Sequence, residues 1–92
     1  GRDALLRRLR VLAAFSENRA DQQLAEIVYR RILQLDQGAH IASNNLAMIL
    51  YRDPQSLDEA LMLAEKAVSA MPANADYQDT LNVVLAAWES AQ

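Results

Sequence analysis

The most informative gaps in this 92-residue sequence are in cysteine, glycine and proline. The absence of cysteine excludes disulfide bonds, thiolate catalysis and zinc sites built on cysteine. With Gly1 and Gly38 as the only glycines, no glycine-rich phosphate-binding loop exists. Two prolines and few β-branched aliphatic residues give little support to strands or hairpin turns. The longest apolar run, residues 83–88, is too short to insert into a membrane.

Charge is small in total but uneven along the chain. The formal net charge is −3, yet residues 1–31 hold seven arginines against four acidic residues, and residues 32–92 hold two cations against eight. Because nucleic-acid binding needs many cations facing phosphates, this balance argues against a nucleic-acid partner. The cluster Arg7, Arg8 and Arg10 leaves two interpretations open: a local contact with phosphate or lipid headgroups, or a solvated helix face, which we favour.

What the sequence has in quantity is alanine, at 17 of the 92 positions. This composition suits helices that pack closely through small side chains. Apolar residues recur at helical spacing in five segments separated by short polar breaks. We therefore expect an all-α chain of five helices.

Local signals predict where the first three helices end. The first fades around residues 16–19, and Asp21 can cap the second helix. We expect Gly38 to terminate the second helix. The third must end near Arg52, because Pro54 disfavours helical geometry in the residue before it.

The last two helices have their own start and stop signals. Ser56 and Glu59 have the spacing of a capping box, in which each side chain satisfies an amide of the first turn. We expect this box to start the fourth helix, Pro72 to close it and Asn74 to cap the fifth.

Short patterns recur along the chain with a period of 34 or 35 residues. The pair Leu-Ala at 12–13 returns at 46–47, and in the alternate helices Ala25 returns as Ala60. A period of this length is typical of stacked helical hairpins. Five alanines are expected where the helices of a hairpin approach closely, namely Ala13, Ala25, Ala47, Ala60 and Ala67.

These residues resemble the tetratricopeptide-repeat (TPR) family, whose unit is a 34-residue helix-turn-helix. Residues 40–74 match best, with Leu46-Ala47 in the first helix and with Ala60, Ala67 and Pro72 at the offsets of the family in the second. The resemblance implies a right-handed solenoid of five antiparallel helices.

The resemblance also divides the chain, residues 1–92, into repeats of a single domain. Residues 6–39 form the first repeat, with Gln37 where the family has proline. Residues 40–74 form the second, and residues 75–91 resemble half a repeat or a capping helix.

In such solenoids the first helix of each hairpin lines a concave groove. The resemblance therefore implies a non-catalytic scaffold that binds a peptide or helix of another protein. Asn44 and Asn45 are the strongest candidates, because an amide both donates and accepts hydrogen bonds. Two alternatives stay open: Asn45 makes a contact between repeats, and Met48 fills space in the core. The residues that the resemblance assigns to the groove are Arg7, Arg10, Ala14, Ile41, Asn44, Asn45, Met48, Tyr51, Arg52, Asp76, Asp79 and Val83.

We expect no catalytic site, cofactor or metal ion. His40 is the only histidine, and the paired carboxylates lie in first turns of helices, where the helix dipole favours an acid. Some family members hold the terminal carboxylate of a partner with cations on successive first helices. Asp76 and Asp79 stand where such cations would be needed, so we do not expect that activity.

A second hypothesis comes from the number of repeats. Two and a half units fall short of the three that a stable array usually needs. Three explanations are open. The fifth helix is a cap, or the chain is excised from a longer solenoid, as its first residue, Gly1, suggests. In the third, the chain self-associates as a homodimer through its terminal helix. The residues expected to pair with a second copy are Val84, Leu85 and Trp88.

Overall fold

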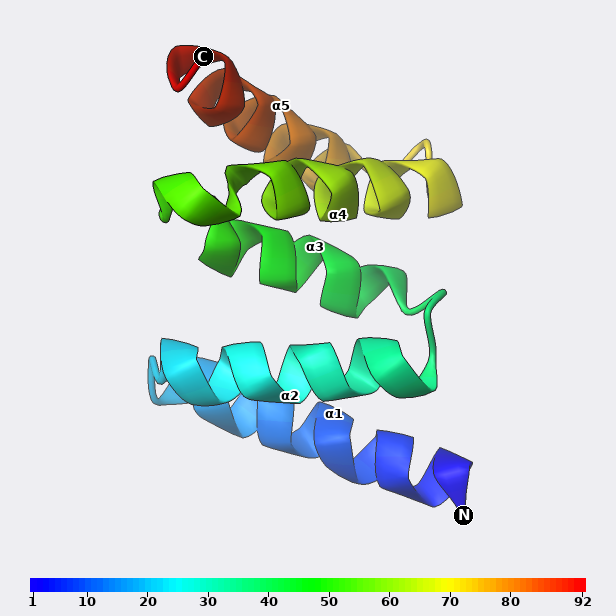
Figure 1. The fold of residues 1–92 in the computed structure, drawn as a ribbon. Helices are drawn as coiled ribbons and strands as arrows, with labels where there is room; N and C mark the ends of the chain where they lie inside the picture. Colours follow the sequence, from blue (N-terminus) through cyan, green and yellow to red (C-terminus); the bar gives the residue numbers. More distant parts are fainter.

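A computed structural model describes residues 1–92 and contains five α-helices and one turn of 3₁₀ helix (Figure 1). The α-helices are α1 (Arg2–Asn18), α2 (Gln22–Leu35), α3 (His40–Leu50), α4 (Leu57–Ala70) and α5 (Ala75–Ser90). The 3₁₀ turn η1 (Pro54–Ser56) precedes α4. The expected all-α chain of five helices is confirmed, and none of these helices is both long and apolar enough to cross a membrane.

The helices pack in sequential order, because each connection is only a few residues long. The chain reverses direction at every turn, so that α1 and α5 lie at opposite ends of the stack (Figure 1). α3 lies in the middle and packs against both α2 and α4, with a smaller contact to α5. The resulting compact domain measures 42 × 27 × 20 Å.

Small side chains allow the close approach between these helices. All five alanines expected at the contacts, Ala13, Ala25, Ala47, Ala60 and Ala67, are buried. Larger side chains, among them Tyr29, Ile32 and Leu46, fill the space around them. Each of the five positions is therefore buried, as packing of helices through alanine requires.

Several predicted helix ends agree with the structure. The side chain of Asp21 caps α2 by accepting from the backbone N–H of Leu24 at 3.0 Å, and Asn74 caps α5 by accepting from that of Tyr77 at 3.0 Å. α3 ends at Leu50, just before Arg52, and α4 ends at Ala70, before Pro72. These short-range signals are therefore confirmed.

The capping box predicted at Ser56 is wrong. The Ser56 hydroxyl donates to Oδ2 of Asp53 at 3.2 Å and makes no cap on α4. Glu59 does not reach back to it, because its carboxylate binds Arg30 of α2 instead. A charged partner on a neighbouring helix outcompetes a local amide, since ionised pairs make stronger hydrogen bonds.

Gly38 does not terminate α2 as expected. The helix ends at Leu35, and Asp36 turns to an extended conformation with φ −146°. Gly38 does not have the positive φ of a C-cap glycine; its N–H donates to Oδ1 of Asp36 at 3.1 Å. The aspartate side chain, and not a left-handed glycine, therefore shapes this turn.

Candidate functional site

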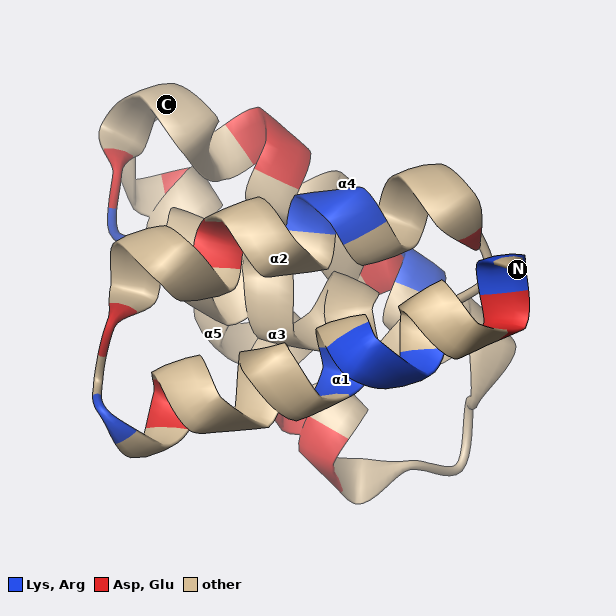
Figure 2. Ribbon diagram, turned by 90° about the horizontal axis from the view of Figure 1, so that it is seen from below, with Lys and Arg blue, Asp and Glu red and all other residues tan.

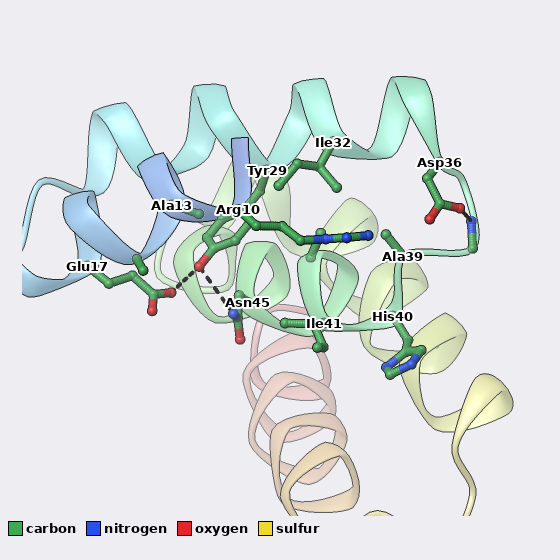
Figure 3. A pocket seen from close by; sticks show the side chains of 13 residues that line it. Arg10, Ala13, Glu17, Tyr29, Ile32, Asp36, Ala39, His40, Ile41 and Asn45 are labelled. Carbon is green, nitrogen blue, oxygen red and sulfur yellow. Dashed lines mark hydrogen bonds between the residues drawn. The ribbon is translucent and has the colours of Figure 1, made fainter. Parts of the chain in front are cut away.

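An open pocket of about 420 Å³ lies between α1 and α3, with α2 contributing part of its wall (Figure 3). Seven of its 13 lining residues are apolar. Such a surface suits the side chains of a peptide better than a strongly polar ligand. The lining residues are Arg10, Ala13, Ala14, Glu17, Tyr29, Ile32, Asp36, Gly38, Ala39, His40, Ile41, Ala42 and Asn45.

A chain of hydrogen bonds crosses one side of this pocket (Figure 3). The buried Tyr29 hydroxyl donates to the Glu17 carboxylate and accepts from Nδ2 of Asn45 at 3.1 Å. Nδ2 of Asn44 in turn donates to Oδ1 of Asn45 at 3.2 Å. Burial, followed by the Glu17 hydrogen bond, raises the pKa of Tyr29 well above its ordinary value, so the phenol stays protonated. These bonds tie α1, α2 and α3 together.

Arg10 is the only arginine or lysine that lines this pocket, and the chain leaves it without an ionic partner. Arg30 of α2 is the only cation of the structure in an ion pair. The Arg10 side chain extends along the pocket, between Ile32 and Ile41 (Figure 3). Its guanidinium is therefore available to a carboxylate from outside the chain.

At the other end of the pocket, the polar side chains are hydrogen-bonded to other groups of the chain. Asp36 accepts from Gly38, and Nδ1 of His40 lies 2.7 Å from the hydroxyl of Tyr77 on α5. Burial raises the pKa of Tyr77, with the Asp76 charge contributing to the same shift. His40 is thus engaged by a neighbouring helix, and its ring meets that of Tyr77 edge to face.

A second pocket of about 290 Å³ continues the first toward the other end of α3. The two share Glu17 and Asn45, and the second adds Met48 and Arg52 from α3 and its end. We call the two pockets together the α1–α3 groove. The groove runs along one side of α3, with the Tyr29 hydrogen bonds between its two parts.

The structure brings together part of the predicted binding set. Arg10, Asn45, Met48 and Arg52 line the α1–α3 groove, as do the expected Ala14 and Ile41. Six predicted residues line neither pocket, namely Arg7, Asn44, Tyr51, Asp76, Asp79 and Val83. Asn44 acts through its bond to Asn45, and the ring of Tyr51 lies under the guanidinium of Arg52, 5.8 Å away. Arg7, Asp76, Asp79 and Val83 are exposed elsewhere on α1 and α5.

Sequence reasoning missed the residues that α2 and the turns supply. Tyr29 and Ile32 belong to the alternate helix, which the repeat pattern assigns to packing rather than to the groove, and Asp36 lies in the turn after that helix. Glu17 lies four residues after Ala13 on the same helix, so helical spacing was the available signal for it.

The residues expected at a homodimer contact behave differently from one another. Val84 is fully buried in the core, so the expectation that it pairs with a second copy is wrong. Trp88 is partly buried, and its indole N–H donates to Oδ1 of Asp58 on α4 at 2.8 Å. Leu85 alone of the three is exposed. The apolar face of α5 is used mainly within the chain.

An ion pair between side chains joins α2 and α4. The Arg30 guanidinium donates to both carboxylate oxygens of Glu59, at 2.7 and 3.0 Å, and to Glu26 at 3.1 Å. The Arg30 bond holds the pKa of Glu59 below its ordinary value and that of Arg30 above it. We call the hollow around this pair, about 330 Å³ in volume, the α2–α4 cleft.

The structure gathers no group of three or more metal-ligating side chains. Comparisons of the chain with protein-family models, curated proteins and solved structures gave no match.

Proposed function

We propose that the chain is a non-catalytic interaction scaffold of the tetratricopeptide-repeat kind, which binds a peptide or helix of another protein in the α1–α3 groove. The observation that carries the proposal is the groove itself, which combines apolar walls with the unpaired Arg10 and the amide of Asn45. Apolar contacts supply affinity, and a charge with an amide supplies orientation.

The repeat register supports the proposal. The alanines at matching positions of residues 6–39 and 40–74 are buried alike, which fits two hairpins that pack in the same way. Residues 75–91 then supply the half repeat that covers the second hairpin. The groove follows α1 and α3, the first helices of the two hairpins, which are the helices that the resemblance assigns to binding.

The chemistry of the groove favours binding over catalysis. Its phenol is held protonated by burial and by Glu17, and its histidine is hydrogen-bonded to Tyr77. A general base must be free to reach a substrate proton. Both groups already have partners in the chain, as do the carboxylates of Glu17 and Asp36, which accept hydrogen bonds from Tyr29 and Gly38.

The test starts from peptides selected against the 92-residue chain from a displayed library, with affinities measured by fluorescence anisotropy. Met48→Glu places a carboxylate among the groove walls, and we expect it to weaken binding at least about tenfold. Lys66→Glu is the matched control, because Lys66 is exposed and lines the α2–α4 cleft instead.

Two results would contradict the proposal. One is an equal loss of affinity in both variants while circular dichroism shows both folded. The other is full affinity in Met48→Glu. Arg10→Glu refines the test, since peptides with an acidic residue should lose affinity for it and peptides without one should not.

A further inference from the structure

One flank of α1 carries apolar side chains that nothing in the chain covers. Leu5, Leu12 and Phe15 are 38%, 37% and 50% exposed. Their spacing of seven and three residues places them on one stripe of the helix. Arg8 and Arg19 lie on the same stripe, each four residues from one of these apolar side chains, and the Arg19 guanidinium lies 5.2 Å from the centre of the Phe15 ring. This stripe is distinct from the Arg10 side of α1, which faces the groove.

α5 presents the exposed apolar side chain of Leu85, beside residues that pack on the rest of the chain, at the other end of the stack. Leu85 is 37% exposed, and the partly buried Leu81 and Trp88 lie four residues before it and three residues after it. Glu89 lies four residues after Leu85. α5 has no cation and carries three exposed carboxylates, those of Asp76, Asp79 and Glu89.

The two ends have opposite charge. α1 carries four arginines against Asp3 and Glu17, and in Figure 2, seen from the α1 end, basic segments are prominent on that helix. None of the α1 arginines and none of the α5 carboxylates forms an ion pair within the chain. Two copies meeting through α5 would oppose carboxylates to carboxylates, and two meeting through α1 would oppose arginines to arginines. Only α1 against α5 joins unlike charges.

We propose that copies of this chain associate head to tail, with α5 of one copy packed on the Leu5–Leu12–Phe15 stripe of α1 of the next. The Leu5–Leu12–Phe15 stripe and Leu85 form the centre of the contact, and Arg8 and Arg19 face Glu89 at its rim. Because the two faces differ, each copy keeps one free end, so the assembly grows as an open chain and does not stop at a dimer. A contact between single helices is small and its rim charges are screened, so the association is weak and weakens with salt.

The test is sedimentation velocity of the 92-residue chain over a range of concentrations. Phe15→Glu blocks the α1 end, and Leu85→Lys blocks the α5 end; both residues are exposed, and circular dichroism checks that both variants fold. We expect the wild-type sedimentation coefficient to rise with concentration without a plateau at the dimer, and to rise several-fold less steeply in 500 mM than in 50 mM salt.

The decisive measurement mixes the two variants. Each alone should stay monomeric, whereas the mixture should form a one-to-one pair and nothing larger, because only one free α1 face and one free α5 face remain. A wild-type chain that is monomeric throughout would overturn the proposal, as would dimerisation of Phe15→Glu alone, which indicates an α5–α5 contact. Met48→Glu should associate like the wild type, so this test and that of the groove fail independently.

Discussion

The α1–α3 groove and the α2–α4 cleft are alike in position but opposite in charge chemistry. Each is a hollow between helices that are second neighbours in the chain; the groove has two pockets of about 420 and 290 Å³, and the cleft has one of about 330 Å³. In the cleft, Arg30 is bound by Glu59 and Glu26 of the same chain. In the groove, the Tyr29 hydroxyl donates a hydrogen bond to the Glu17 carboxylate, and Arg10 forms no ion pair. The internal ion pair of Arg30 therefore distinguishes the cleft, where it links two helices of the fold, from the groove that we propose binds a partner.

The largest effect should come from enlarging a side chain on the helix between the two hollows. Ala47 of α3 is fully buried, so Ala47→Leu should lower the free energy of unfolding by about 1–3 kcal/mol through overpacking. Ala14→Leu adds the same atoms at an exposed groove position and should change stability by less than about 0.5 kcal/mol. Urea denaturation followed by far-UV circular dichroism measures both. Equal losses would mean that the groove is part of the core.

The next effect should come from the hydrogen bonds in the groove. Tyr29→Phe leaves the Glu17 carboxylate and the Asn45 amide without their phenol, and should cost about 1–2 kcal/mol. Because the pKa of Tyr29 is raised above its ordinary value of 10, wild-type stability is fully present below pH 10 and falls as the pH rises further.

The same denaturation series, repeated from pH 7 to pH 11, tests this assignment. Tyr29→Phe should lose less stability above pH 10 than the wild type does. Tyr51→Phe is the control, because no hydrogen bond involves the Tyr51 hydroxyl, and we expect it to behave as the wild type. A Tyr51→Phe variant as unstable as Tyr29→Phe would refute the role of the hydrogen-bonded chain.

The smallest effect should come from the ion pair of the α2–α4 cleft. Arg30→Met should cost at most about 1 kcal/mol, because Arg30 and Glu59 are both more than a third exposed and water screens their attraction. Arg10→Met, the matched change in the groove, should leave stability unchanged, since Arg10 has no ion pair to lose.

Acid distinguishes these two variants further. The pKa of Glu59 is lowered by Arg30, so the contribution of the pair is present above the ordinary value of 4.5 and disappears as the pH falls below it. The difference between wild type and Arg30→Met should therefore shrink below about pH 4 in thermal melts. A difference that persists in acid would show that Arg30 acts through packing of its aliphatic stem.

Features that depend on near neighbours were predictable from the sequence. Apolar spacing predicted the five helices, and Asp21 and Asn74 cap them as expected because a cap involves residues two or three positions apart. The alanines were predictable through their period, since equivalent positions of stacked hairpins meet equivalent surroundings.

Pairings between distant residues were not predictable. Arg30 meets Glu59, 29 residues away, and this contact removes Glu59 from the capping box that its local spacing predicted. Tyr77 reaches His40 across 37 residues, and Tyr29 reaches Glu17 across 12. For the groove, Asn45 and Met48 of α3 and Arg52 just after it line the pockets and stay predictions as binding residues. The α2 side chains behind them required the packing angle of the hairpin, which no spacing in the sequence encodes.

The indole of Trp88 is bonded to Asp58, and it belongs to the only tryptophan of the chain. Its fluorescence therefore comes from a single place, the seam between the last two helices. An undocking of α5 would change this emission while most of the backbone stayed helical. The molecule thus carries an intrinsic optical probe that can separate fraying of its terminal helix from cooperative unfolding of the whole domain.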